Sequence, residues 1–91
     1  MKYVLFYETA DDGIAKAAAV FPAHKVRLDE FHGRGTLVMV GTFANPQHDG
    51  SMAIFTTRDA AEEFARGDPF VVNGVVASWR VLEWNEILTG P

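Results

Sequence analysis

The sequence contains three histidines, the side chains that titrate closest to neutral pH, and one of them is positioned for chemistry. His24 lies in the segment 21–35, FPAHKVRLDEFHGRG, whose pattern predicts an amphipathic helix. At helical spacing, His24, Leu28 and Phe31 share the apolar side of this helix, so the imidazole should face the core. A histidine held there by a carboxylate keeps one ring nitrogen free to accept or donate a proton. The candidate chemistry is therefore general acid–base catalysis.

Asp68 is the carboxylate that the predicted topology brings to His24. It follows a predicted helix that ends at Gly67, and Pro69 disfavours a helical conformation at the residue before it. Asp68 should therefore cap the short turn 70–73, a role that typically stabilises by about 1 kcal/mol. The same carboxylate can also orient His24. The alternative is that His24 is a core histidine whose partners are purely structural, as for most buried polar groups.

The other two histidines do not predict a metal site. His32 lies two helical turns, roughly 12 Å, beyond His24, too far for both to bind one ion, and it should be exposed. His48 and Asp49 are neighbours in the polar connection ANPQHDG, where solvation explains both. The chain has no cysteine, so thiolate ligands and disulfides are excluded. No metal and no other cofactor is expected.

Strand and helix patterns define the elements that position these residues. The predicted strands are 2–8, 36–43, 51–57 and 75–86, and the predicted helices are 21–35 and a second helix capped by Thr56 or Thr57 and ended by Gly67. Pro22 marks the start of the first helix, because a proline at the first position removes an N–H that has no partner anyway. The alanine-rich segment 14–20 lacks a clear apolar stripe, and we expect a variable loop with some helix there.

The order strand, helix, strand, strand, helix, strand predicts a ferredoxin-like α+β fold, with a four-stranded antiparallel sheet and both helices on one face. In this topology the end of the first strand lies beside the start of the first helix and the end of the second. Tyr7 and Phe70 should therefore lie beside the histidine and its carboxylate. Tyr7, Phe70 and Phe21 would then form the walls of a substrate-binding pocket, and Tyr7 fits a wall better than an acid.

The strand composition also predicts a homodimer. The runs Tyr3–Tyr7 and Leu37–Val40 are apolar on both faces, yet two helices can cover only one face of the sheet. A chain of 91 residues also buries only about 60 to 65% of its unfolded surface, so its own core is marginal. A second copy packed on the open sheet face would answer both points.

Composition favours a single domain spanning residues 1–91, since 48% of the residues are hydrophobic and no low-complexity linker divides them. The 8 basic residues are scattered and outnumbered by 12 acidic ones, giving a net charge of -4. Nucleic acid and anionic membranes are therefore poor partners. No charged leader and no apolar run of about 18 residues is seen, so we expect a soluble cytoplasmic protein.

The same residues, in the same order, resemble the YCII-related family. The likeness lies in PAH ahead of an amphipathic helix with a second histidine and glycine, a strand that ends in GTF, and DPFVVNGV, and it covers most of the chain. It implies a dimeric α+β barrel of ferredoxin-like subunits with an active site around a histidine and an aspartate. Those roles fall on His24 in PAH and Asp68 in DPF. The relatives include small-molecule dehalogenating and isomerising enzymes of aromatic breakdown.

Three functional hypotheses follow. The first is a cofactor-independent enzyme in which His24, oriented by Asp68, moves a proton on a small aromatic or lactone-like substrate during elimination or isomerisation. The second is a non-catalytic dimeric module that binds a small molecule or a partner in the same cleft. The third is a haem protein in which His24 would be the iron ligand, since haem binding is known among dimeric α+β barrels.

Overall fold

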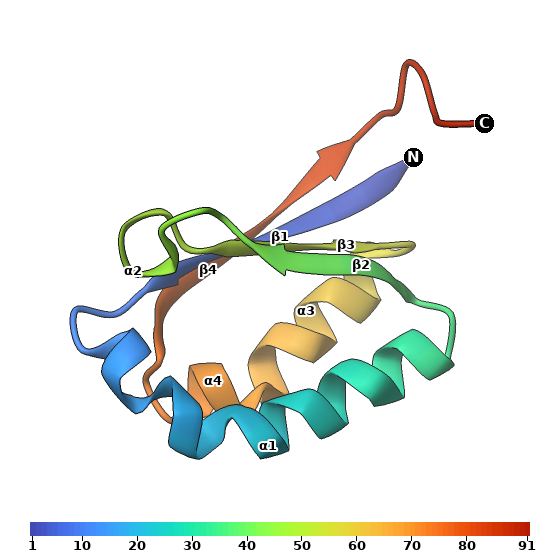
Figure 1. The fold of residues 1–91 in the computed structure, drawn as a ribbon. Coiled ribbons are helices and arrows are strands. Elements are labelled where there is room, and N and C mark those ends of the chain that lie inside the picture. The colour runs from blue at the N-terminus through green and yellow to red at the C-terminus, as the bar shows by residue number, and fades with distance from the viewer.

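A computed structural model describes all 91 residues as a four-stranded antiparallel sheet with helices on one face (Figure 1). The elements are β1 (Lys2–Thr9), α1 (Gly13–Gly33), β2 (Leu37–Thr42), α2 (Pro46–Asp49), β3 (Ser51–Phe55), α3 (Arg58–Gly67), α4 (Pro69–Val72) and β4 (Val76–Trp84). The strand order is β2-β3-β1-β4, so the first strand pairs with the third and fourth. This arrangement confirms the predicted ferredoxin-like α+β fold.

The hydrophobic core lies between the sheet and the helices. Leu5 pairs with Ala53 on one side and Val81 on the other, which places all three on the helix-covered face. Phe31 of α1 and Phe64 of α3 meet edge to face, with ring centroids 5.2 Å apart. Both helices are therefore held against the sheet by rings that are completely buried.

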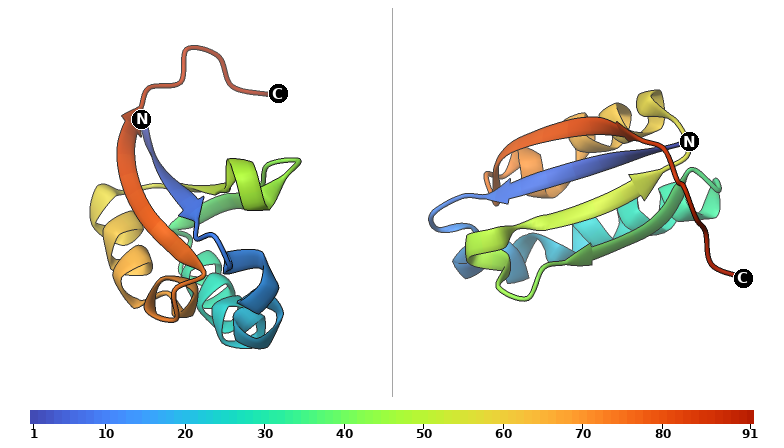
Figure 2. Two further views of the ribbon diagram at one scale, coloured as in Figure 1. Left: turned by 90° about the vertical axis from the view of Figure 1, so that its left-hand side faces the viewer. Right: turned by 90° about the horizontal axis from the view of Figure 1, so that it is seen from above.

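No helix covers the opposite face of the sheet, which the right-hand view of Figure 2 looks down upon. Val4, on this face, pairs with Ile54 and with Leu82. Met39, Leu82 and Trp84 are exposed large apolar side chains, whereas Val4 and Ile54 are shielded by their neighbours. The predicted two-sided apolar character of the strands is thus present, and one side of it faces solvent in the single chain.

The first helix is longer than predicted, and the predicted loop at 14–20 is wrong. α1 begins at Gly13, passes through Pro22 and ends at Gly33. A proline inside a helix removes one hydrogen bond and bends the axis, and Figure 1 shows α1 bent between its blue and green parts. The alanines of residues 14–20 favour a helix before the proline. The C-terminal end of the helix was predicted correctly, and Gly35 follows it with φ +81°.

The caps of the later helices agree with the sequence. The Thr57 hydroxyl accepts a hydrogen bond of 3.1 Å from the Ala60 N–H at the start of α3. Asp68 caps the single turn α4, and Gly74 follows with φ +72°. The connection ANPQHDG is not entirely irregular, because Asn45 caps the short helix α2 within it. None of the helices is long and apolar enough to cross a lipid bilayer.

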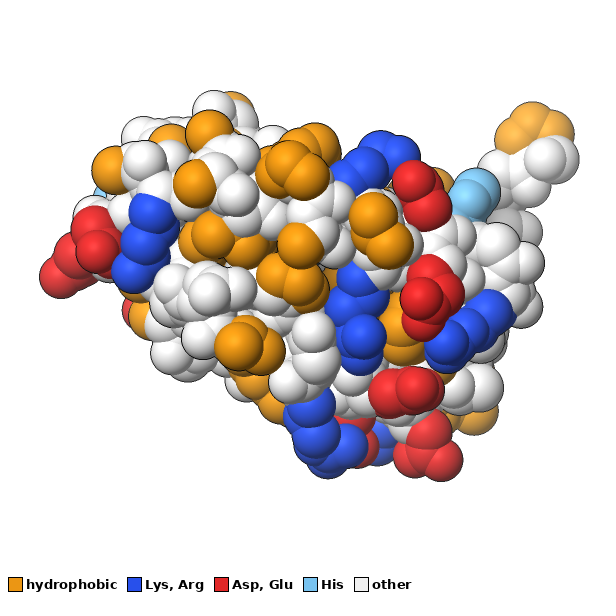
Figure 3. All heavy atoms as spheres, turned by 90° about the horizontal axis from the view of Figure 1, so that it is seen from below, with side chains coloured by type: hydrophobic (Ala, Val, Ile, Leu, Met, Phe, Trp, Pro, Cys, Tyr) orange, Lys and Arg blue, Asp and Glu red, His pale blue; other side chains and the backbone are white.

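The outer surface of the helical layer has two unlike halves (Figure 3). Apolar side chains gather on one half of this surface and charged side chains on the other. The exposed apolar residues of the helices include Ile14 and Phe21 of α1 and Val72 of α4. The apolar half overlies the elements that carry the candidate site.

Candidate functional site

Asp68 is the centre of the candidate site, and its side chain is fully buried, with 0% exposure. Its Oδ2 accepts a hydrogen bond of 2.6 Å from the Tyr7 hydroxyl. Its Oδ1 lies 2.7 Å from His24 Nδ1 and accepts a bond of 3.1 Å from the Phe70 N–H. Each of the three neighbours can donate, so both carboxylate oxygens of Asp68 have hydrogen-bond partners within the chain. Capping α4 and orienting His24 are therefore both carried out by this one side chain.

His24 is held through one nitrogen and left free at the other. It is 7% exposed, and Nδ1 bonds Asp68 across 44 positions of sequence, as predicted. Because the Asp68 carboxylate accepts a hydrogen bond from Nδ1, that nitrogen carries a proton. In the neutral ring the other nitrogen, Nε2, then carries the lone pair. No side chain or backbone group of the chain forms a hydrogen bond with Nε2. Nε2 is also absent from the fully buried polar atoms that lack a partner, so it retains some accessible surface. This nitrogen can exchange a proton with a bound molecule.

Tyr7 completes the hydrogen bonding of the carboxylate and stays protonated. Burial raises the pKa of the Tyr7 phenol far above its ordinary value of 10.0, and the charge of Asp68 and the hydrogen bond to it raise the pKa further. Arg27 opposes this shift only in part. Tyr7 is therefore a fixed donor to Asp68 at physiological pH.

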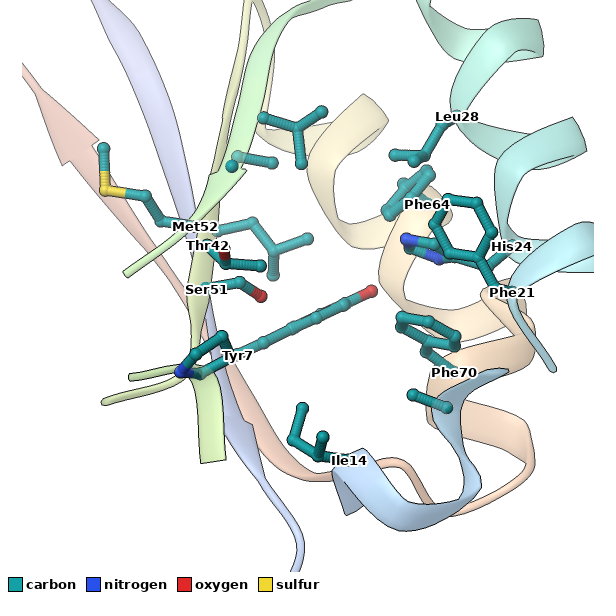
Figure 4. A pocket seen from close by; sticks show the side chains of 16 residues that line it. Tyr7, Ile14, Phe21, His24, Leu28, Thr42, Ser51, Met52, Phe64 and Phe70 are labelled. Atoms are coloured by element: carbon teal, nitrogen blue, oxygen red, sulfur yellow. The ribbon is translucent and has the colours of Figure 1, made fainter. Parts of the chain in front are cut away.

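A cavity of about 370 Å³ lies between α1 and the sheet, with His24 and Tyr7 in its lining (Figure 4). The helical wall includes Ile14, Phe21 and Leu28 from α1. The sheet wall carries the hydroxyls of Thr42 and Ser51 among apolar residues. Lys, Arg, Asp and Glu are absent from the lining. The cavity therefore suits a small, largely apolar molecule with few polar atoms.

Two phenylalanines fix the position of the imidazole ring. Phe70 stacks on His24, with centroids 3.8 Å apart and planes at 4°. Phe21 lies at the rim, its ring 6.0 Å from that of His24 and 6.4 Å from that of Phe70. Stacking on one side and the Asp68 bond at the edge restrict rotation of the ring. The structure thus brings together all five residues that the sequence predicted for this site: Tyr7, Phe21, His24, Asp68 and Phe70.

Sequence reasoning missed the part of the pocket wall formed by Ile14 and Ala17. The signal was present, because residues 14, 17, 21, 24, 28 and 31 follow one another at alternating intervals of three and four, the spacing of one helix face. This stripe runs straight through Pro22. Thr42 and Ser51 were also missed, since alternation along two short strands does not reveal a cavity.

The remaining histidines lie outside this site. His32 is exposed, as predicted. His48 and Asp49 are exposed too, although their side chains do bond each other at 2.8 Å, which the sequence reasoning did not expect. No group of three or more potential ligands from His, Cys, Asp and Glu is close enough to hold a metal ion.

The fold and the buried pair define the class: a ferredoxin-like α+β protein with a carboxylate-bound histidine at the wall of an apolar pocket. The chain belongs to the YCII-related domain family, whose domain matches residues 1–85. Protein YciI of Escherichia coli O6:H1 is 33% identical over 85 residues, covering 82% of this chain and 87% of that protein. Protein YciI of Shigella flexneri gives the same values.

Two solved structures share the fold. The 5-chloro-2-hydroxyhydroquinone dehydrochlorinase TftG of Burkholderia phenoliruptrix AC1100, in complex with 2,5-dihydroxybenzoquinone, superimposes with a TM-score of 0.76 at 18% identity. The likeness covers 93% of this chain and 94% of that one. An antibiotic biosynthesis monooxygenase gives a TM-score of 0.54 at 10% identity, covering 96% and 98%. At such identities these likenesses establish the architecture.

Proposed function

We propose that this protein is a cofactor-independent acid–base enzyme that acts on a small, ring-shaped substrate by elimination or isomerisation. One observation carries the proposal: His24 Nδ1 is fixed by a buried carboxylate at 2.7 Å, and the imidazole, whose Nε2 has no partner in the chain, lines an apolar cavity. A general base must lie within hydrogen-bond reach of the proton that it removes. A molecule bound against His24 in the cavity would bring a proton within this reach of Nε2.

The proposed reaction begins with transfer of a substrate proton to Nε2. In an elimination the electron pair of the broken C–H bond forms a new double bond, and the leaving group departs with its own pair. Asp68 stabilises the imidazolium that results, because the two groups are held in contact away from water. In an isomerisation the same nitrogen returns the proton at another atom. Tyr7 acts as a positioning residue through Asp68, and Phe70 and Phe21 act as substrate-binding walls.

The character of the cavity supports a weakly polar substrate. A carboxylate-bearing ligand would find no Lys or Arg in the lining to pair with. The hydroxyls of Thr42 and Ser51 stand on the sheet wall opposite His24, where they can bind ring oxygens (Figure 4). The dehydrochlorinase that shares the fold holds a dihydroxybenzoquinone, a ligand of this chemical kind.

We propose further that the active protein is a homodimer that packs through the open sheet face. Met39, Leu82 and Trp84 expose large apolar surfaces there, and their burial against a second copy would stabilise both. The two sheets would then enclose a barrel, while each His24–Asp68 pair remains complete within its own chain.

The test is a substrate screen followed by matched variants. Small aromatic diols, lactones and halogenated ring compounds form the screen. His24→Gln should lower turnover by about a hundredfold or more with ligand affinity preserved, and Asp68→Asn should have a smaller effect. His48→Gln is the matched control, since it changes the exposed histidine that also bonds an aspartate, and turnover should not change.

If His24→Gln leaves turnover of the identified substrate unchanged, the acid–base role is wrong. If ligands bind in the cavity but none is turned over by the wild-type protein, the site is that of a non-catalytic binding module.

A further inference from the structure

The segment after β4 exposes two large aliphatic side chains to solvent. Ile87 is 95% exposed and Leu88 is 91% exposed, more than any other large apolar residue of the chain. The segment 87–91, ILTGP, contains no charged side chain. Figure 1 shows that it rises from the sheet on the face that no helix covers.

The start of this segment is fixed in direction. Glu86 bonds Lys2 Nζ at 2.7 Å through one carboxylate oxygen and lies 2.8 Å from the amine of Met1 through the other. Two cations therefore clamp Glu86 beside the beginning of β1. The segment that follows departs from this anchor toward the space above the sheet, where a second copy would lie.

The open face offers a hollow that matches the segment chemically. It has a volume of about 250 Å³ and lies over β2 and β3, with Met39, Phe43, Met52 and Ile54 in its lining. The lining contains no charged residue. The aliphatic side chains of Ile87 and Leu88 can therefore enter it without leaving a charge unpaired.

In the single chain the segment does not fill this hollow. Ile87 and Leu88 stay almost fully exposed, and the side chains that line the hollow have no cover from the tail of their own chain. Both apolar surfaces are therefore available to a second copy.

We infer that Ile87 and Leu88 of each subunit dock into the β2–β3 hollow of a second copy of this chain. The inference rests on the proposed dimer and adds a contact, here called the clasp, between the tail of one subunit and the hollow of the other. Two-fold symmetry repeats the contact, so each subunit gives one tail and receives another. Leu82 and Trp84, exposed on the same open face, precede the tail and are separated from it only by Asn85 and Glu86.

The first test measures the dimer dissociation constant by sedimentation. Exchanging both Ile87 and Leu88 for Ser should raise this constant at least tenfold, equivalent to about 1.4 kcal/mol. Val72→Ser is the matched control, because Val72 is 69% exposed on the helical side, and it should leave the constant unchanged.

The second test uses the absence of native cysteines. A chain carrying Leu88→Cys is mixed with a size-tagged chain carrying Phe43→Cys and oxidised mildly. A disulfide between the two chains is expected, and a chain carrying both changes should not close on itself at high dilution.

The inference holds only if both results occur. A wild-type dimer whose dissociation constant is unaffected by the Ser changes, or a disulfide formed only within one chain, overturns the clasp and leaves the dimer proposal intact. A wild-type protein that remains monomeric at high micromolar concentration overturns both, and the acid–base proposal is then still tested separately by His24→Gln.

Discussion

The two faces of the sheet differ in whether groups in an unfavourable environment, a buried carboxylate on one face and exposed apolar side chains on the other, have partners within the chain. On the helix-covered face a fully buried carboxylate, Asp68, has three hydrogen-bond donors from its own chain. On the open face, apolar side chains such as Met39 and Trp84 are about half exposed to solvent. A buried charge without partners would cost far more than an exposed methionine. The hydrogen bonding of Asp68 is thus complete within the single chain, whereas part of the apolar surface of the sheet is left uncovered.

The largest effect that separates the two faces should come from Phe64→Ala. Phe64 is fully buried among three aromatic rings, and its truncation should lower the free energy of unfolding by about 3–5 kcal/mol. Met39→Asp on the open face should instead abolish the dimer and leave the unfolding free energy of the monomer within about 0.5 kcal/mol of wild type.

Urea denaturation at two protein concentrations distinguishes these cases. The midpoint of the wild type should rise with protein concentration, because association stabilises the folded state, and that of Met39→Asp should not. If Met39→Asp destabilises the fold as much as Phe64→Ala does, the contrast between the faces is wrong. Phe64→Leu provides a milder change should the alanine variant fail to fold.

Tyr7→Phe should have an intermediate effect. It leaves Asp68 Oδ2 buried without its 2.6 Å donor, so the free energy of unfolding should fall by about 1–3 kcal/mol. Because the folded pKa of Tyr7 is raised, its contribution is complete below the ordinary value of 10.0 and is lost as the pH rises above it. Thermal unfolding from neutral to alkaline pH measures both. Tyr3→Phe serves as the control, since its hydroxyl is exposed.

The smallest effect concerns Glu86 at the open end of the sheet. Hydrogen bonds from Lys2 and from the terminal amine lower its pKa from 4.5 to about 2. Its contribution to folding should therefore be present above pH 4.5 and lost as the pH falls toward about 2. A carboxyl-carbon NMR titration should show a depressed midpoint that moves up in Lys2→Ala. A midpoint near 4.5 in the wild type would show that the clamp does not form in solution.

Much of the fold could be predicted because its signals are local. Alternating and continuous apolar runs locate the four strands, and hydroxyl or carboxylate caps locate α3 and α4, since such groups satisfy N–H groups only a few residues away. The first half of α1 was misjudged because Pro22 counts locally against a helix. Packing of the stripe from Ile14 to Phe31 along the pocket and core outweighs one missing hydrogen bond.

The candidate site, too, could be predicted only in part from the sequence. Residue types and order along the chain already determined that a histidine on an apolar helix face and a capping aspartate would meet at one end of a ferredoxin-like sheet. Only the tertiary structure decided that Asp68 also accepts from Tyr7, that Phe70 covers one face of the His24 ring, and that His24 lines a cavity with two hydroxyl side chains on its sheet wall. The physical reason is the separation along the sequence between the groups that interact. Caps and periodicity act over a few residues, whereas a hydrogen bond between positions 7 and 68 depends on how every strand and helix between them packs.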